Sequence, residues 1–221
     1  MNFEMFDARV FVYVGMFGSG KTEIAINTAV ELKSKKENVA LLDIDVISPY
    51  FRSRDKKEPL EKMGIKVISP PGALSHADLP IITAQVGGYI SNEKFFTVAD
   101  VGGNEDGATV LGSLKPFLDK ANKKVFFVVN TLRPFSTTFD EIVRNIKKIS
   151  AVSRTKIDYL VNNTNIAQET TEENVKRGEE LIKKVSEYLE IPVAFSVINE
   201  DMNFTGDFPV FKLKRYLTDL W

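Results

Sequence analysis

Residues 15–22 read Gly-Met-Phe-Gly-Ser-Gly-Lys-Thr, which is a complete G-x-x-x-x-G-K-T phosphate-binding loop. The apolar run at residues 10–14 precedes this motif, and a helical pattern over residues 22–34 follows it. In such a strand–loop–helix context the loop's backbone N–H groups surround a phosphate chain, and the positive end of the helix dipole strengthens their field. The sequence therefore predicts a nucleotide site made by Gly15, Phe17, Gly18, Ser19, Gly20, Lys21 and Thr22.

Two side chains of the motif carry distinct chemistry. Lys21 supplies a mobile positive charge for the outer phosphates, and we expect it to act in catalysis. The Thr22 hydroxyl is placed to bind Mg²⁺. A dinucleotide-binding fold is rejected, because the glycine spacing is G-x-x-G-x-G and not G-x-G-x-x-G.

Composition narrows the class of protein. A chain of 221 residues with 43% hydrophobic content fits a single domain over residues 1–221. The net charge of −1 gives no general attraction to nucleic acid or membranes, so no nucleic-acid partner is expected. The chain has no cysteine, which excludes disulfides and thiolate metal sites and agrees with a cytoplasmic location. The first residues lack the pattern of a signal peptide, and no apolar run approaches the ~20 residues that span a bilayer.

Strand and helix patterns alternate along the chain. Strands are predicted at residues 10–14, 39–43, 66–68, 95–100, 125–130, 159–162 and 192–197, and helical patterns lie between them. Alternation of this kind predicts an α/β fold in three layers, with a mostly parallel sheet and helices on both faces.

Some boundaries carry their own signals. Thr138 and Glu141 can form a capping box, and Thr170 with Glu173 is placed at the start of a later helix. Pro116 should kink or end its helix. Residues 47–60 are predicted to form a long, polar, basic loop.

Acidic residues follow two of the predicted strands. Ligands of parallel α/β sheets bind beyond the carboxyl ends of the strands, where these residues gather. Asp100, followed by Val-Gly-Gly, has the Walker B form and is predicted to hold Mg²⁺ together with Thr22. Asp45 is predicted to position the attacking water as a catalytic residue, while Asp43 is interpreted as a structural strand-end acid.

These residues resemble a known family. Asp43-Ile44-Asp45, Asp100-x-Gly-Gly and a late strand that ends in Asn are similar to the ParA/MinD/CobQ group of P-loop ATPases, of the SIMIBI class. The stretch from Asp43 to Arg52 is similar to uncharacterised ATP-binding members. The resemblance implies a P-loop NTPase fold, ATP and Mg²⁺ as cofactors, and a homodimer or protein partner. The family's signature lysine is replaced by Met16, which puts nucleotide-sandwich dimerisation in doubt.

The residues at the strand end, 162–165, indicate which nucleotide base the site would bind. GTPases read guanine with an Asn-Lys-x-Asp segment, whereas this chain has Asn-Asn-Thr-Asn. Amides donate and accept hydrogen bonds, which suits the adenine edge, and the resemblance implies an Asn for adenine at this place. Asn162 and Asn163 are both candidates, and strand phase alone does not choose between them.

The remaining features are weaker. Arg52 and Arg54 lie in the polar loop after Asp45, where they could contact the γ-phosphate or a partner, although a solvated basic loop is the favoured alternative. Arg133, at the end of another strand, is a candidate for the rim of the site. His76, the only histidine, is expected to be a surface or capping residue. The amphipathic basic segment at residues 211–221 is expected to pack on the fold; contact with a membrane surface is the less favoured alternative.

Together these patterns predict a Mg²⁺-dependent ATP-binding protein, an ATPase that acts as a nucleotide-driven switch. A small-molecule kinase or ATP-dependent ligase, and a non-hydrolysing nucleotide sensor or maturation chaperone, stay open as alternatives, because the same site would serve each of them.

Overall fold

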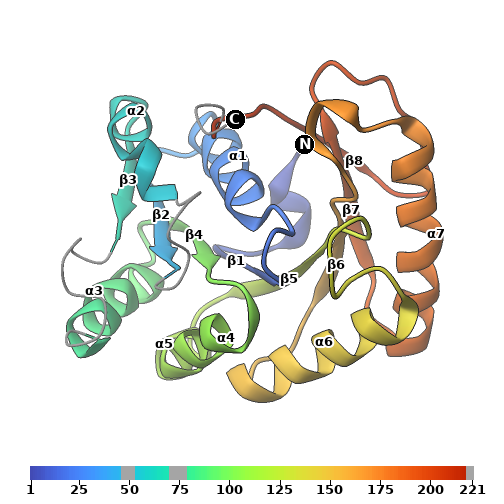
Figure 1. The fold of residues 1–221 in the computed structure, drawn as a ribbon. Helices are drawn as coiled ribbons and strands as arrows, with labels where there is room; N and C mark the ends of the chain where they lie inside the picture. The colour runs from blue at the N-terminus through green and yellow to red at the C-terminus, as the bar shows by residue number, and fades with distance from the viewer. Residues whose placement is uncertain (46–52, 70–78, 218–221) are drawn as a thin grey trace.

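A single eight-stranded sheet forms the centre of the computed structural model, which describes residues 1–45, 53–69 and 79–217 (Figure 1). The order of the strands across the sheet is β3-β2-β4-β1-β5-β6-β7-β8, and every pair of neighbours is parallel. The strands are β1 (Val10–Gly15), β2 (Val39–Ile44), β3 (Ile65–Ile68), β4 (Phe96–Val101), β5 (Lys123–Val129), β6 (Tyr159–Asn162), β7 (Val193–Asn199) and β8 (Val210–Leu213).

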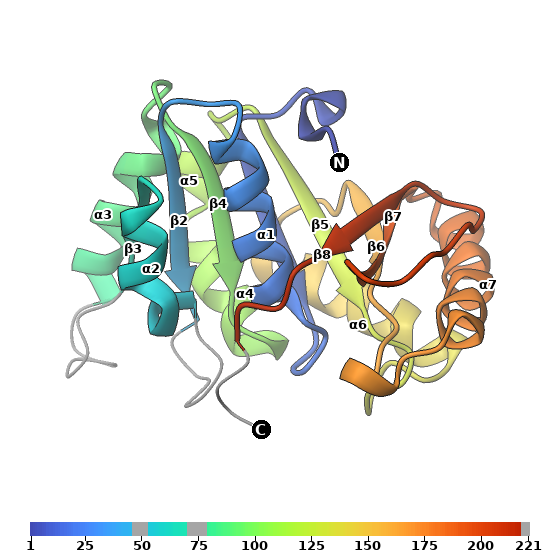
Figure 2. The same ribbon diagram turned by 90° about the horizontal axis from the view of Figure 1, so that it is seen from above.

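Helices cover both faces of this sheet (Figures 1 and 2). One apolar core lies under α1 (Lys21–Lys33), α2 (Lys57–Lys62) and the N-terminal 3₁₀ turn Phe3–Phe6. The opposite core lies under α3 (Leu79–Ser91), α4 (Asn104–Ser113), α5 (Lys115–Leu118), α6 (Phe139–Ser153) and α7 (Glu172–Leu189). The predicted three-layer α/β fold with a parallel sheet is confirmed.

The strand sequences explain why the sheet is covered on both sides. In β1 every residue is buried, and in β5 the five residues from Val125 to Val129 are buried in succession. A strand with apolar side chains on both faces is stable only between two layers. Since β1 lies between β4 and β5, the loop that follows it opens at the carboxyl edge of the sheet, beside the ends of both neighbours.

Several element boundaries differ from the sequence prediction. The N-cap of α7 is Thr171, which forms its capping box with Asn174, so the expected pair Thr170 and Glu173 is wrong by one residue. The Thr170 hydroxyl donates instead to the carbonyl of Ala167 and accepts from the N–H of Ile166. Capping residues recur at neighbouring positions here, and the tertiary path of the chain decides which of them starts the helix.

Two further segments gain structure that the sequence did not indicate. The second half of the expected loop at residues 47–60 is helical, with a 3₁₀ turn at Ser53–Lys56 followed by α2, whereas residues 46–52 lie outside the described part. Residues 210–213 form β8 at the edge of the sheet, because parallel pairing with β7 satisfies their backbone groups. The helical segment that contains Pro116 is divided at Leu114 into α4 and α5, in agreement with the predicted effect of Pro116.

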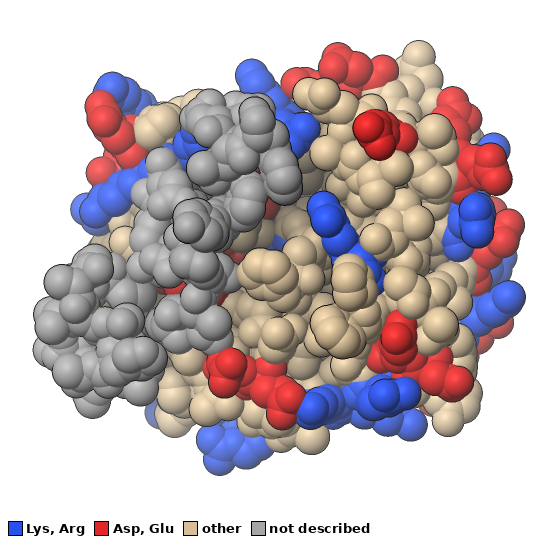
Figure 3. Space-filling view, viewed as in Figure 1, with Lys and Arg blue, Asp and Glu red and all other residues tan. Residues whose placement is uncertain are grey.

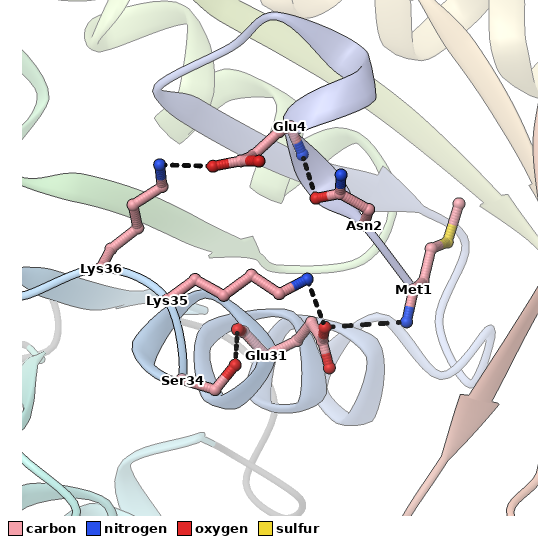
Figure 4. Close-up of polar contacts among 7 residues, drawn as sticks. All are labelled: Met1, Asn2, Glu4, Glu31, Ser34, Lys35 and Lys36. Carbon is pink, nitrogen blue, oxygen red and sulfur yellow. Dashed lines mark hydrogen bonds and ion pairs between the residues drawn. The ribbon is translucent and has the colours of Figure 1, made fainter.

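Charged contacts tie the N-terminus to α1 at the end far from the loop (Figure 4). Glu31 Oε1 lies 3.7 Å from the Met1 amino group and 3.1 Å from Lys35 Nζ. Lys36 Nζ lies 2.6 Å from Glu4 Oε1. These groups are partly exposed, so each pair contributes little to the stability of the fold.

Where Figure 3 colours residues by charge, the face that it draws has no large region of a single sign. Basic and acidic side chains of the described residues alternate around its edge, and the centre is mostly uncharged. In the described ranges, no helix combines the length and hydrophobicity needed to cross a membrane. The field on this face is therefore mixed, in keeping with the near-zero net charge.

Candidate nucleotide-binding site

The loop between β1 and α1 has a backbone that two glycines make possible. Gly15 lies against β5 so closely that a Cβ atom there would be 2.4 Å from the carbonyl oxygen of Val128. Gly20 has φ of +88°, and a Cβ atom there would lie 2.2 Å from Asn163 Nδ2. That Asn163 amide donates to the carbonyl of Ser19 at 2.7 Å, so the end of β6 holds the loop in position. Any other residue at these glycines would force the loop away from its neighbours.

Lys21, at the first position of α1, lies inside the loop. Its side chain is buried, and Nζ donates to the carbonyl of Met16 at 3.0 Å, so the lysine crosses the opening of the loop. Burial lowers the pKa of Lys21, and the nearby carboxylates of Asp100 and Asp45 oppose that shift. A buried ammonium group near carboxylates is well placed to pair with phosphate oxygens.

Asp100 is a buried acid of the site whose carboxylate lacks hydrogen bonds of standard geometry. It pairs in register with Tyr13 of β1 and Asp43 of β2, and it is 1% exposed. Neither carboxylate oxygen has a hydrogen-bond partner of standard geometry. Burial raises the pKa of Asp100 to about 8, Asp43 adds to that rise, and Lys21 and the Thr22 hydroxyl oppose it. A buried carboxylate without partners is costly unless a cation or a proton satisfies it.

Asp43 and Asp45 lie together at the end of β2. Both are buried, and the N–H of Asp45 donates to Asp43 Oδ1 at 3.2 Å. Asp45 lines the cavity described below, and its side chain packs against Gly102, where a Cβ atom would lie 2.9 Å from Asp45 Oδ1. Asp43 is close enough to Asp100 to affect its pKa. The structure thus brings the two strand-end acids and the Walker B acid to one place, as the sequence predicts.

Asn104 is a functional candidate that sequence reasoning missed. It begins α4 directly after Gly102 and Gly103, has φ of +63°, and accepts a hydrogen bond from the N–H of Phe17 at 3.2 Å. A Cβ atom at Gly103 would lie 2.9 Å from the backbone of Phe17. The loop after β4 therefore contacts the phosphate-binding loop directly. The signal available in the sequence was the Asn next to the Gly pair, since Asn tolerates a left-handed backbone.

A cavity of about 320 Å³ extends from the phosphate-binding loop along the carboxyl ends of β6, β7 and β8. Its lining includes Gly18, Gly20, Lys21, Thr22, Asp45, Asn163, Asn165, Val197, Asn199 and Leu213. Such a cavity, mostly apolar with a few convergent polar groups, is typical of a small-molecule site.

The two candidate asparagines have different places. Asn163 lines the cavity and holds the loop, as described above. Asn162 instead points into a buried network, where its amide donates to Ser196 Oγ and to the carbonyl of Val175 and accepts from Thr164. Because successive side chains of a strand point to opposite faces, only one of the two could reach the ligand.

Only some of the other candidate residues lie in the described part of the chain. Arg133 lines the cavity, and its side chain lies next to Gly18. Arg52 and His76 lie outside the described residues, as does the side chain of Arg54. Phe17 and Ser19 differ in exposure, with Phe17 62% exposed and Ser19 buried within the loop.

The site fits a magnesium ion that is held jointly with a ligand. Among the described residues, no three His, Asp or Glu side chains gather into a complete metal site. Mg²⁺ does not need one, since it takes one or two carboxylates, substrate phosphates and water. The partnerless oxygens of Asp100, with the Thr22 hydroxyl near them, are the hard ligands that such a metal requires.

Solved structures with a similar fold were found by comparison. The signal recognition particle receptor FtsY from Elizabethkingia anophelis, in complex with GDP, superposes with a TM-score of 0.59 at 20% identity over 86% of this chain. The cell division protein FtsY from Thermotoga maritima gives 0.60 at 19% identity over 87%. The chain has a P-loop NTPase fold. FlhF complexed with GTP/Mg²⁺ is also similar, with a TM-score of 0.57 at 16% identity over 88% of this chain.

The chain matches only part of the length of these structures. The chain spans 57% of the first FtsY structure, 62% of the second and 67% of FlhF. No family model matches the chain, and no curated protein matches it in sequence. The neighbours support the coarser part of the sequence resemblance, the P-loop NTPase fold. They do not support the finer expectations of the ParA/MinD/CobQ group and of an adenine nucleotide, since the ligands named for them are guanine nucleotides.

Proposed function

We propose that this chain binds a nucleoside triphosphate with Mg²⁺ and works as a nucleotide-driven switch with slow hydrolysis. The observation that carries the proposal is the buried carboxylate of Asp100, which makes no hydrogen bond of standard geometry, next to Lys21 and Thr22 of a complete phosphate-binding loop. A bound metal and phosphate chain would satisfy Asp100 and Lys21 together.

The residues of the loop have separate tasks in this proposal. Backbone N–H groups from Phe17 to Thr22 hold the phosphates, and Lys21 exchanges the carbonyl of Met16 for phosphate oxygens. Thr22 and Asp100 would hold Mg²⁺, which supplies charge neutralisation at the transferred phosphoryl group. Asp45 lines the cavity near Lys21 and orients the attacking water.

The switch is proposed to involve the contact between Asn104 and Phe17. Asn104 Oδ1 accepts from the N–H of Phe17 at 3.2 Å, and Gly102 and Gly103 lie tightly against Asp45 and Phe17. A terminal phosphate that competes for this part of the loop would shift the balance between two positions of the segment after β4. Loss of that phosphate on hydrolysis would restore the contact.

The base is proposed to be adenine, on the grounds of the residues at the strand end. Both parts of the Asn165 amide are engaged, because Nδ2 donates to the carbonyl of Asn163 and Oδ1 accepts from the N–H of Ala167. Asn165 stands where the guanine-reading Asp of the Asn-Lys-x-Asp segment would be, so the two-oxygen acceptor for guanine is missing. GTP is the second candidate, because the FtsY and FlhF neighbours hold GDP and GTP.

Calorimetry with Mg²⁺ tests the proposal and separates the two bases. We expect binding of ATP to the purified chain, weaker binding of GTP, and at least a tenfold loss of affinity, about 1.4 kcal/mol, in Lys21→Ala. The matched control is Lys33→Ala, which removes a lysine from the last turn of the same helix and should bind as the unmodified chain does. Binding of GTP in preference to ATP would transfer the assignment to a guanine nucleotide. No heat with either triphosphate would refute the function.

A partner is part of the proposal and has its own test. A switch acts through a second protein or a second copy of the chain. Phe17, which lines the cavity, and Phe135, two residues after the cavity-lining Arg133, are large apolar side chains that are 62% and 68% exposed. We expect the elution volume in gel filtration to depend on whether the triphosphate or the diphosphate is bound, if the partner is a second copy. Equal elution in both states would leave a different protein as the partner.

A further inference from the structure

The residues that follow β8 lie across the first half of α1, close to the phosphate-binding loop (Figure 2). We call residues 214–217 the strap. Its first contact is with Asn27, whose amide pairs with both backbone groups of Lys214. Asn27 Oδ1 accepts from the N–H of Lys214 at 2.9 Å, and Nδ2 donates to its carbonyl at 2.8 Å. Asn27 is 7% exposed, so these bonds are sheltered from water.

Glu23 holds the other end of the strap. Its carboxylate accepts from the N–H of Tyr216 at 3.1 Å and from the N–H of Leu217 at 2.7 Å. Glu23 and Asn27 are four residues apart on α1, which puts them on the same side of the helix. Burial raises the pKa of Glu23, and the two backbone N–H groups oppose the rise. The Glu23 carboxylate thus loses hydration on burial, and its hydrogen bonds to the strap partly offset that loss.

The other side of the strap faces the nucleotide cavity. Arg215 and Leu217 of the strap line this cavity, together with Leu213 of β8 and the strand-end residues Val197 and Ile198 of β7. Glu23 itself also lines the cavity and follows directly after Thr22. The strap therefore binds to α1, the helix that begins at the phosphate-binding loop, on one side and lines the apolar part of the cavity on the other.

The position of the phosphates fixes what this part of the cavity can receive. If the phosphate chain lies on the loop from Phe17 to Thr22, the nucleoside must extend into the remaining space along β6, β7 and β8. Aliphatic side chains along that space suit the face of a planar ring, and a guanidinium group adds a partner for ring or ribose oxygens.

We propose that the strap, together with Leu213 at the end of β8, is the nucleoside-binding wall of the site. Leu213, Arg215 and Leu217 contact the ribose and base, and Glu23 and Asn27 are positioning residues. This inference rests on the proposed function and adds to it the element that receives the nucleoside. Because one helix carries both Thr22 and Glu23, occupation of the cavity and docking of the strap are coupled, and each stabilises the other.

The decisive experiment compares a nucleotide with its phosphate chain alone. Calorimetry with Mg²⁺ is run with ATP, GTP and inorganic tripolyphosphate on the unmodified chain, Asn27→Ala and Arg215→Ala. We expect both variants to lose about tenfold or more in affinity for the preferred nucleotide, while tripolyphosphate binds within about twofold of the unmodified value.

Matched controls come from the same two elements. Glu31→Gln removes a carboxylate from α1 at the end that contacts Met1 and Lys35 (Figure 4). Lys212→Ala removes an exposed cation from β8 that donates to the carbonyl of Glu200. Neither residue lines the cavity, so both controls should bind nucleotide and tripolyphosphate as the unmodified chain does.

A shortened pair provides a second measurement. A chain that ends at Leu217 keeps every described residue, whereas a chain that ends at Leu213 lacks the strap. The first should keep full nucleotide affinity, and the second should lose it while it keeps tripolyphosphate binding. Hydrogen exchange should also show that nucleotide slows exchange at the N–H groups of Tyr216 and Leu217 in the unmodified chain.

The outcomes separate this inference from the function on which it rests. If the variants bind nucleotide as the unmodified chain does, the strap is not the nucleoside wall. If nucleotide and tripolyphosphate affinities fall together, the strap only supports the fold. If the unmodified chain binds tripolyphosphate but gains nothing from a nucleoside, the wall is refuted and the phosphate site stands. If it binds neither, the proposed function itself fails.

Discussion

At the scale of single residues, the hydrogen bonding of the Asp100 carboxylate has the clearest consequence for ligand binding. The sequence places an acid at the end of a strand, but it does not show that both oxygens are buried without a hydrogen bond of standard geometry. Tertiary contacts set that state, because β2 and β1 bring Asp43 and the loop residues against Asp100. Single residues of this kind store an unfavourable interaction that a ligand relieves.

Asp100→Asn should stabilise the chain when metal and nucleotide are absent. The pKa of Asp100 is about 8 in the folded chain, against an ordinary value of 3.8. The folded state therefore binds this proton more tightly than the unfolded state does, and folding stability falls as pH rises from about 4 to about 8. We expect Asp100→Asn to lack this loss and to be more stable by roughly 1–3 kcal/mol at pH 8.

Urea unfolding at several pH values in the presence of EDTA measures the effect of Asp100→Asn. The control is Asp201→Asn, which removes an exposed carboxylate and should follow the pH dependence of the unmodified chain. The same variant should bind magnesium nucleotide more weakly. A variant that is less stable than the unmodified chain at pH 8 would show that the ionised carboxylate is already satisfied.

Gly20→Ala tests the loop at the same scale. A Cβ atom there would lie 2.2 Å from Asn163 Nδ2, and φ is +88°. We expect at least a tenfold loss of nucleotide affinity, because the loop must move and the bond from Asn163 to Ser19 breaks. Circular dichroism should show an intact fold. Unchanged affinity would mean that the loop tolerates a different path.

Elements follow local signals well when the signal and the packing agree. The capping box of Thr138 and Glu141 starts α6 as predicted, and Pro116 lies next to the division between α4 and α5. The start of α7 at Thr171 and the pairing of β8 with β7 were not predicted, because neighbouring threonines are equivalent in local propensity and β8 depends on a partner strand. Long-range pairing is absent from any local window of sequence.

Two adjacent glycines of α3 give opposite predictions for the stability of one helix. A Cβ atom at Gly88 would meet no other atom within 4 Å, whereas at Gly87 it would lie 2.6 Å from the ring of Phe117 in α5. Alanine favours a helix over glycine by about 0.5–1 kcal/mol, so Gly88→Ala should raise the free energy of unfolding by that amount.

Gly87→Ala gains the same helix propensity but must displace the ring of Phe117, and we expect a net loss of about 1–3 kcal/mol. Urea unfolding of both variants measures the difference, and each serves as the control for the other. Equal stability of the two variants would show that α3 and α5 are not packed closely at this position.

At the scale of the whole molecule, the site lies at the carboxyl edge of the parallel sheet, where distant segments of the chain meet. The cavity is bounded by the ends of β6, β7 and β8, the start of α1 and the strap, so a ligand there would connect segments that are up to about 200 residues apart in the sequence. Binding to such a site stabilises the folded state against the unfolded state by mass action.

Nucleotide with Mg²⁺ should therefore raise the thermal midpoint. At one hundred times the dissociation constant the gain is about 2.7 kcal/mol. For a chain of this length that corresponds to a shift of roughly 5–11 °C in a differential scanning experiment. EDTA should remove most of the shift, and Lys21→Ala should show little of it. A shift of the same size in Lys21→Ala would place the ligand at another site.

The sequence by itself determined the phosphate-binding loop, the alternation of strands and helices, and the acids at the strand ends. These features follow from local chemistry, since glycine conformation, apolar periodicity and caps act over a few residues. It therefore predicted the three-layer fold and most of the residues that gather at the carboxyl edge of the sheet.

Only the tertiary structure decided which of those residues face the ligand. Strand phase directs Asn163 to the loop and Asn162 into a buried network. The contact of Asn104 with Phe17 and the docking of the strap on Glu23 and Asn27 join segments that are distant in the chain. Such contacts form only when the whole sheet and its helices are packed, because the residues that make them are far apart in the sequence. A local stretch of sequence therefore does not predict them.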